Sequence, residues 1–169
     1  EFTVLLDSAI RHGHILFDNE PNFHIPYLFN YAKSPSKTQE WIADIRETYF
    51  SAIESGLPGN DDLGSMSSWF VFNALGFYAV CPGVPEYNIG TPLFGEVVIH
   101  TEGNNQFVIR GIGTSSKNKY IKSATLNGEK LDKSWFSHSS IIKEGELNLT
   151  MDSVPSDWAT QSNSAAYSA

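Results

Sequence analysis

Apolar residues in the first half of the chain recur at spacings of three and four over residues 35–53. This period places them on one side of an α-helix whose other side is polar. Ser34 and Pro35 are typical of a helix start, and Ser55-Gly56 is typical of a stop. We therefore expect an amphipathic helix that ends near residue 55. Its apolar stripe comprises Trp41, Ile42, Ile45, Tyr49 and Ile53.

Two further segments of this half predict helices. The sequence SMSSWFVFNALGFYAV, residues 65–80, is apolar nearly all round, which indicates a helix buried on most sides. Another helix is expected from about residue 21 to residue 32, with Pro21 near its start. A helix that is apolar on all sides must be covered by neighbouring elements, and a few short helices are barely enough to cover it. Residues 1–90 could fold alone, but this pattern favours the last helices of a larger helical assembly.

After residue 90, apolar and polar residues alternate within several short segments, as they do in β-strands. Asn127-Gly128 between two of them is typical of a two-residue hairpin turn. Residues 91–158 are predicted to form an antiparallel sheet unit, and the small, polar residues 159–169 a flexible tail. Strands that follow helices in this way indicate the α+β class or two separate domains. The segments read GEVVIHT, QFVIRGI, KYIKSATL, KLDK and ELNLTMD.

Composition narrows the classes of partner and site. The 169 residues are 41% hydrophobic and 18% charged, as in a globular domain. The net charge is −8 without a cluster of Lys and Arg, which argues against a nucleic-acid partner, and no apolar run reaches the roughly 18 residues of a membrane span. The single cysteine, Cys81, excludes an internal disulfide and a multi-cysteine zinc site. The chain starts without Met and inside helix-like sequence, so we expect a fragment of a longer protein.

Polar side chains gather on two loops at helix starts, DNEPNFH at residues 18–24 and GNDD at residues 59–62. In each loop an aspartate or asparagine could simply cap the helix that follows. Taken together, carboxylates, amides and an imidazole on loops shaped by glycine and proline also suit the binding of sugar hydroxyls. The same oxygen donors suit a hard cation such as Ca²⁺. On the residues alone, helix capping and a binding site stay open as alternatives.

Longer motifs surround both loops: NEPNFHIPYLFNYA at residues 19–32 and LPGNDDLGSMSSWFVFNALGFYAVCPGVPEYNIGTPLF at residues 57–94. In this order they resemble the C-terminal part of the calcium-dependent exo-α-mannosidases of glycoside hydrolase family 92. The resemblance implies that residues 1–90 are the last helices of an (α/α)₆ catalytic barrel and residues 91–158 the closing strands. The N-terminal β-sandwich of the family and the rest of the barrel would lie outside this chain.

The resemblance also implies roles for the second loop. Family members cleave α-mannosides with inversion, and the second aspartate of the loop, here Asp62, is their general base. Asn60 stands where many relatives have an acidic residue that positions the water, so this chain departs from them there. Asp61 is either a contact to the sugar or a structural, capping residue. The general acid of the family is an upstream glutamate, so we expect that the isolated chain does not hydrolyse mannosides.

The first loop belongs, by the same resemblance, to the sugar and calcium surroundings. Asn19 and Glu20 are the expected substrate contacts and Ca²⁺ ligands, and His24 faces the same site. Relatives often have two consecutive histidines where this chain has Phe23-His24, which removes one polar sugar contact. The expected substrate is a terminal α-mannoside, α-1,2-linked, of mannan or an N-glycan, and the parent is expected outside the cytoplasm. The alternative is a non-catalytic carbohydrate-binding or structural module on the same scaffold.

Overall fold

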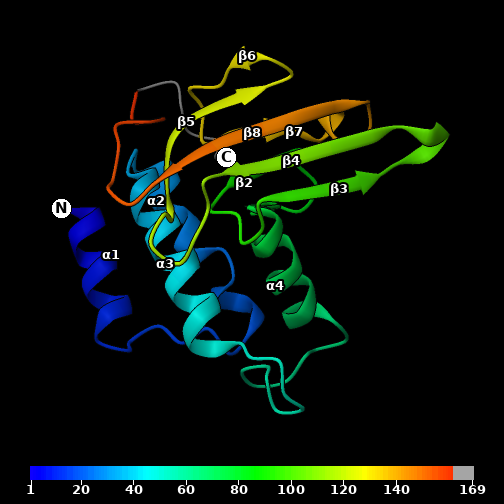
Figure 1. The fold of residues 1–169 in the computed structure, drawn as a ribbon. Coiled ribbons are helices and arrows are strands. Elements are labelled where there is room, and N and C mark those ends of the chain that lie inside the picture. The colour runs from blue at the N-terminus through cyan, green and yellow to red at the C-terminus, as the bar shows by residue number, and fades with distance from the viewer. Residues whose placement is uncertain (162–169) are drawn as a thin grey trace.

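The computed structural model describes residues 1–161 and shows the α+β fold that the sequence predicts. Helices form one layer and the strands lie above them, so the two halves of the chain pack on each other (Figure 1). No helix within residues 1–161 is long and apolar enough to cross a bilayer. The α-helices are α1 (Phe2–Arg11), α2 (Leu28–Tyr31), α3 (Pro35–Tyr49) and α4 (Ser65–Leu75), and the 3₁₀ helices are η1 (Glu20–Asn22), η2 (Ile25–Tyr27), η3 (Glu102–Asn104) and η4 (His138–Ser140).

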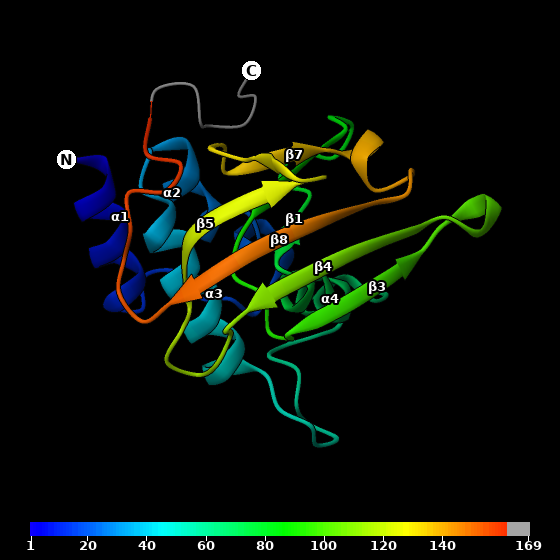
Figure 2. The same ribbon diagram turned by 45° about the horizontal axis from the view of Figure 1, so that its top comes forward.

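The strands form a three-stranded sheet in the order β1-β2-β7 and a five-stranded sheet in the order β3-β4-β8-β5-β6. Among the strands of residues 1–161, the predicted antiparallel pairing is wrong for one pair, because β4 and β8 run parallel. The chain leaves β4, forms β5, β6 and β7, and returns to insert β8 between β4 and β5 (Figure 2). Local alternation carries no information on such a distant pairing. The strands are β1 (Phe77–Tyr78), β2 (Glu86–Ile89), β3 (Glu96–His100), β4 (Gln106–Ile112), β5 (Tyr120–Leu126), β6 (Glu129–Lys130), β7 (Trp135–Ser137) and β8 (Gly145–Asp152).

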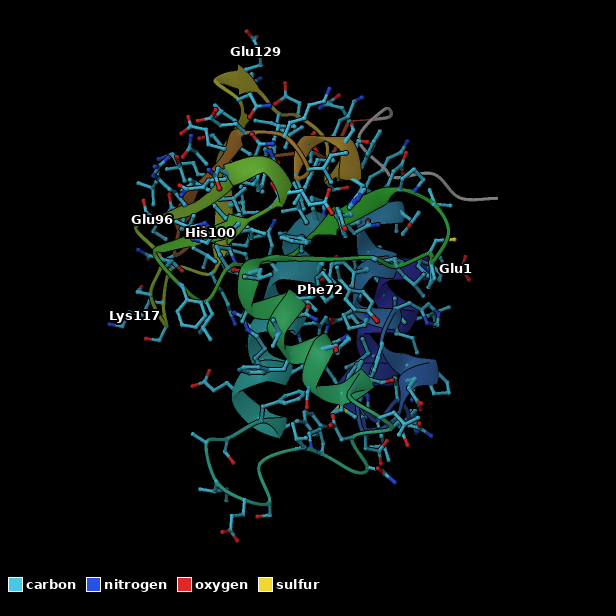
Figure 3. The ribbon with its side chains drawn as sticks, turned by 90° about the vertical axis from the view of Figure 1, so that its right-hand side faces the viewer. Glu1, Phe72, Glu96, His100, Lys117 and Glu129 are labelled. Atoms are coloured by element: carbon cyan, nitrogen blue, oxygen red, sulfur yellow. The ribbon has the colours of Figure 1, made fainter. Side chains whose placement is uncertain are left out.

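The predicted hairpin is confirmed between β5 and β6. Leu126 pairs with Glu129 across the turn, and the residues between them, Asn127 and Gly128, have φ of 53° and 82°. Left-handed backbone at both positions belongs to the turn type whose twist matches that of the flanking strands. Glu129 consequently lies at the outer edge of the sheet layer (Figure 3).

Helix α3 begins at Pro35, as predicted, but ends at Tyr49 rather than near residue 55. Phe50 has extended backbone, with φ of −115° and ψ of 142°, and Ile53 is 67% exposed. Ser34 precedes the helix without a side-chain cap hydrogen bond. The apolar stripe therefore stops one turn earlier than its spacing indicates, and the residues that follow form a loop.

Helix α4 is also shorter than predicted, because Gly76 ends it. Gly76 has φ of 99° and lies against Pro92, whose atoms a Cβ at position 76 would approach to 3.2 Å. Glycine is favoured at such a left-handed helix end. The next two residues form β1. Val71 on α4 is 54% exposed, so the expected burial on most sides is not complete within this chain.

The continuous helix expected over residues 21–32 is broken into η1, η2 and α2. Pro21 and Pro26 both lack an N–H group, and Pro26 lies where a continuous helix would need one. Only the last turn of the segment is α-helical.

Two apolar cores correspond to the two layers. The core among the helices contains Trp41 and Trp69, and the core under the five-stranded sheet contains Trp158. Helix α3 joins the layers through Gln39, whose Oε1 accepts a hydrogen bond from the Ile121 N–H at 2.9 Å. The buried amide therefore ties the helical layer to β5.

The division of the chain between residues 90 and 91 stays a prediction. The three-stranded sheet takes β1 and β2 from before this point and β7 from after it. Ala159, the first residue of the expected tail, is buried with the sheet core. The rest of that expectation falls mainly on residues 162–169, which lie outside the described residues.

Candidate active site

The two polar loops touch at the end of α3 and α4 that points away from the sheets (Figure 1). A Cβ on Gly59 would overlap the carbonyl oxygen of Asp18. Gly59 also has φ of 69°, which glycine adopts at little cost. This glycine therefore allows the close approach that brings residues of the first loop to those of the second.

Asp61 caps α4. Its Oδ1 accepts hydrogen bonds from the Ser67 N–H at 2.8 Å and from the Ser67 Oγ at 2.7 Å. Its carbonyl oxygen accepts from the N–H groups of Gly64 and Met66. A carboxylate at a helix N-terminus satisfies otherwise unpaired N–H groups and interacts favourably with the helix dipole. The hydrogen bonds of Asp61 are those of a cap, and its contact with a sugar stays a prediction.

Asp62 is held through its backbone. Asp62, Leu63 and Gly64 have φ of 50°, 60° and 98°, so three consecutive residues are left-handed. The Asp62 N–H donates to Asn60 Oδ1 at 3.1 Å, and the Ser65 Oγ donates to the Asp62 carbonyl oxygen at 2.9 Å. A left-handed residue other than glycine costs about 1–2 kcal/mol. The loop therefore imposes on Asp62 a conformation that its own backbone does not favour, as is common at functional sites.

The side chain of Asp62 lies beside Glu20 of the first loop, and the two carboxyl groups form a hydrogen bond. Desolvation raises the pKa of Asp62, and the charge of Glu20, this hydrogen bond and the charge of Asp61 raise it further. Two carboxyl groups can hydrogen-bond only when one of them carries a proton. Asp62 therefore holds its proton to higher pH than an isolated aspartate would, and once ionised it is a stronger base.

The first loop is fixed on α4 by Trp69. The indole Nε1 of Trp69 donates to the carbonyl oxygen of Phe23 at 3.1 Å, and the two ring centroids lie 5.8 Å apart. At the start of η1, Asn19 Oδ1 accepts from the Glu20 N–H at 3.0 Å. These contacts set the position from which Glu20 reaches Asp62.

The oxygen donors at this contact fit part of a Ca²⁺ site. Ca²⁺ takes roughly six to eight oxygen ligands, but residues 1–161 contain no group of three or more His, Cys, Asp or Glu side chains placed to hold a metal. Glu20 and Asp62 repel each other when both are ionised, and a cation beside them would relieve this. Asn19 adds an amide oxygen next to Glu20. This chain can therefore supply some of the ligands, and the others would come from elsewhere.

His24 is the predicted site residue that the structure does not bring to this contact. Its side chain is exposed at the start of η2. Within the described chain, no hydrogen bond or ion pair joins it to Glu20 or Asp62. Its contact with a sugar stays a prediction.

Sequence reasoning missed three residues that shape this end of the molecule. Ser67 and Trp69 carry no signal beyond a polar first turn and a core aromatic, although they anchor the two loops. Arg46 does carry a signal in the sequence. It follows Ile42 by four positions and therefore falls on the buried stripe of α3. A charged residue at such a position needs a partner or a function.

Residues 3–153 match the family model described as the glycosyl hydrolase family 92 catalytic domain. An uncharacterized secreted glycosidase of Arthroderma benhamiae is 32% identical over 166 residues. That alignment covers 96% of this chain and 21% of the relative.

Two solved structures from Bacteroides thetaiotaomicron have a similar fold. One, an inverting mannosidase of family GH92, is 38% identical with a TM-score of 0.87, over 95% of this chain and 22% of that chain. The other, a GH92 α-mannosidase, is 34% identical with a TM-score of 0.88, over 92% and 21%. The chain thus spans about a fifth of the length of these relatives. Because the family model matches most of its residues, the chain belongs to glycoside hydrolase family 92.

Proposed function

We propose that this chain is part of an inverting, exo-acting α-mannosidase and that it carries the general base, Asp62. Membership of the family and the mannosidase neighbours support a glycosidase parent. The observation that carries the proposal is the meeting of the two loops, which sets Asp62 beside Glu20 while Asp61 caps α4. Asp61 is thus hydrogen-bonded to the helix, and the carboxyl group of Asp62 remains available to act as the base.

Inversion requires a water molecule that attacks the anomeric carbon from the side opposite the leaving group. Asp62 accepts a proton from this water during the attack, and its raised pKa makes it a better acceptor. Asn60 already accepts the Asp62 N–H through Oδ1, so its amide NH₂ is the group that orients the water. An amide at this position contributes orientation without adding negative charge.

The general acid of the proposed enzyme lies outside this pair of loops. An inverting enzyme separates its two carboxyl groups by about 6.5–9.5 Å to admit the water, whereas Glu20 and Asp62 are hydrogen-bonded to each other. Asp61 is engaged with Ser67. We infer that the acid belongs to the remainder of the (α/α)₆ barrel, which together with an N-terminal β-sandwich completes the parent. The isolated chain is accordingly expected to be inactive.

In this proposal Asn19 and Glu20 hold Ca²⁺ together with ligands from outside the chain. When bound, the ion would supply positive charge to hydroxyls of the mannose and would favour the distorted ring of the transition state. This chain keeps the ligand oxygens in place, because the Trp69 hydrogen bond fixes the loop that carries them. His24 and Asp61 complete the proposed sugar contacts.

The proposed substrate is a terminal α-1,2-linked mannoside of mannan or an N-glycan, and the proposed location is outside the cytoplasm. The name of the fungal relative, a secreted glycosidase, supports this location. The linkage is carried by the family resemblance and not by a feature of the two loops.

Asp62→Asn in the full-length parent tests the proposal. Loss of the base should lower kcat on terminal α-mannosides by about 10²–10⁴-fold with little change in Tm. Glu54→Gln is the matched control, since it also removes one carboxylate charge, from an exposed side chain on the neighbouring loop. Unchanged turnover in Asp62→Asn would rule out the base assignment. A folded parent that binds mannosides without any turnover would instead indicate the non-catalytic module.

A further inference from the structure

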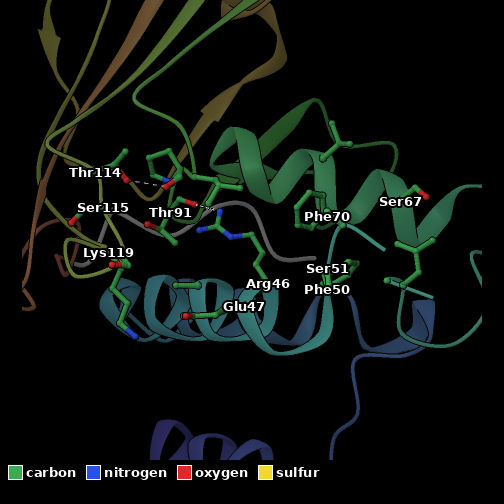
Figure 4. A pocket seen from close by; sticks show the side chains of 18 of the residues that line it. Arg46, Glu47, Phe50, Ser51, Ser67, Phe70, Thr91, Thr114, Ser115 and Lys119 are labelled. Atoms are coloured by element: carbon green, nitrogen blue, oxygen red, sulfur yellow. Dashed lines mark hydrogen bonds between the residues drawn. The ribbon is translucent and has the colours of Figure 1, made fainter. Parts of the chain in front are cut away.

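A cavity of about 630 Å³ opens between α3, α4 and the loop of residues 114–119 (Figure 4). Most of its wall is apolar. Leu57, Phe70, Val71 and Leu93 contribute to it, and Phe70 packs on Phe50 with ring centroids 5.1 Å apart. Two side chains of this wall are themselves exposed, Val71 to 54% and Leu93 to 44%.

Arg46 is one of the polar residues of the wall, which also include Glu47 and Lys119, and its burial is the unusual feature of this cavity. Arg46 is only 8% exposed. Burial lowers its pKa to about 10, so it remains charged at neutral pH. No carboxylate within residues 1–161 forms an ion pair with it, although burying an unpaired charge is costly.

The hydrogen bonds of Arg46 leave one edge of the guanidinium unused. Nη1 donates to the carbonyl oxygens of Asn73 and Thr91, each at 2.6 Å. Nε is buried without a partner, and in the described part of the chain no hydrogen bond is formed by Nη2 either. Because Nε is closed off from the cavity, Nη2 is the guanidinium group that a ligand there can reach. A carboxylate is the partner that forms the strongest hydrogen bonds with a charged guanidinium. Glu47 also lines the cavity, but within residues 1–161 it forms no ion pair with Arg46, so the guanidinium still lacks a carboxylate partner.

We propose that a segment of the parent chain outside residues 1–169 docks in this cavity, with apolar side chains against Phe70 and Val71 and an Asp or Glu carboxylate on Arg46. Two observations select a protein segment over a small carboxylate. The apolar wall contains large exposed side chains, among them Leu57, Val71 and Leu93, as an internal contact surface does. The relatives, moreover, have about four-fifths of their length outside the region that this chain matches. The inference rests on the proposed function only in taking this chain as part of a longer one.

Thiol labelling of a Val71→Cys variant tests the docking. Cys81 is exposed and is first replaced by Ser, so that position 71 carries the only thiol of residues 1–169. Each labelling rate is divided by the rate of the same chain in denaturant. In the full-length parent the thiol should react at least about tenfold more slowly than in the 169-residue chain, because a covered side chain reacts only after local opening. Equal rates in the two chains would overturn the proposal.

A second measurement blocks the cavity with a large side chain and leaves the hydrogen bonds of Arg46 in place. Ala43→Trp places a large side chain in the cavity wall on α3, and it should expose position 71 to labelling in the parent. Thr48→Trp, on the exposed side of the same helix, is the matched control and should leave the thiol covered. Protection that persists in Ala43→Trp would overturn docking at this site.

The partner segment is identified by a photoreactive p-benzoylphenylalanine at position 71 of the parent. A cross-linked peptide from outside residues 1–169 that contains Asp or Glu supports the proposal. A cross-link to residues 1–169 of a second copy, or slowing of the labelling of the 169-residue chain by sodium acetate, would overturn it in favour of a dimer or a small carboxylate. Labelling does not depend on hydrolysis. An inactive parent with a covered position 71 would therefore contradict the proposed function and leave this inference intact.

Discussion

Asp61 accepts hydrogen bonds from both the backbone N–H and the hydroxyl of Ser67, at 2.8 and 2.7 Å, and so fixes the second loop to the first turn of α4. Asp61→Ala removes both bonds and should lower the free energy of unfolding by about 0.5–2 kcal/mol, the usual cost of losing a helix cap. Urea unfolding of the single variants Asp61→Ala and Ser67→Ala and of the double variant measures the coupling between them. Additive losses would show that the two side chains do not interact in solution.

The contact of the two loops gives a second prediction, at Gly59. Gly59→Ala meets two obstacles, a φ of 69° and overlap of the new Cβ with the Asp18 carbonyl oxygen. Gly83→Ala is the matched control, because Gly83 has φ of 96° but no atom within 4 Å of an added Cβ. The control should cost about 1–2 kcal/mol from backbone strain alone, and Gly59→Ala should cost more. In the parent, only Gly59→Ala should also raise KM for mannosides, because it separates Asp62 from Glu20. Equal effects of the two substitutions would mean that the loops do not touch.

The parts of the fold that could be predicted are those decided by neighbouring residues. Asn127-Gly128 specifies its hairpin because both residues tolerate positive φ. The end of α4 was missed because Gly76 lies inside an apolar run that hides the stop. The parallel pairing of β4 with β8 was missed because it joins strands separated by three others along the chain.

The candidate site shows the same limit of local information. Asp62 and Glu20 were assigned by resemblance, and each of them could equally have been a residue near a helix start. What sets Asp62 apart from Asp61 is which of the two binds Ser67, and this depends on three successive left-handed residues that no propensity predicts. Arg46 was visible as a charge on an apolar stripe, but its missing partner could be recognised only once Asn73 and Thr91 were placed against it.

A third prediction concerns calcium. Because residues 1–161 place no group of three or more His, Cys, Asp or Glu side chains together, the 169-residue chain should bind Ca²⁺ much more weakly than the parent. Calorimetric titration of both proteins with Ca²⁺ measures the difference. In the parent, Glu20→Gln should weaken Ca²⁺ binding, whereas Glu54→Gln, an exposed change on the neighbouring loop, should not. Equal affinity of chain and parent would mean that these loops form a complete site by themselves.

A fourth prediction concerns acid stability and arises from the cluster that joins α1 to α3. Arg11 contacts Asp7 at 2.8 Å and Glu40 at 2.7 Å, and Lys37 contacts the same two carboxylates at 3.2 and 3.1 Å. Trp41 Nε1 also donates to Asp7 at 2.9 Å. Burial alone would raise the pKa of each carboxyl, but these hydrogen bonds and charges outweigh it and lower both pKa values.

The lowered pKa values fix the direction of the pH dependence. The stability that Asp7 and Glu40 contribute is fully present above their ordinary pKa values of 3.8 and 4.5. It is lost as the pH falls through their lower values in the folded chain, because the folded state must then take up protons that it binds less readily than the unfolded state. Asp7→Asn keeps an oxygen acceptor for Trp41 and removes the charge, so it should lower stability at pH 7 and flatten its decline in acid. Urea unfolding of both proteins between about pH 3 and pH 7 measures this. A decline of equal steepness in the two proteins would show that Asp7 is not a source of the acid sensitivity.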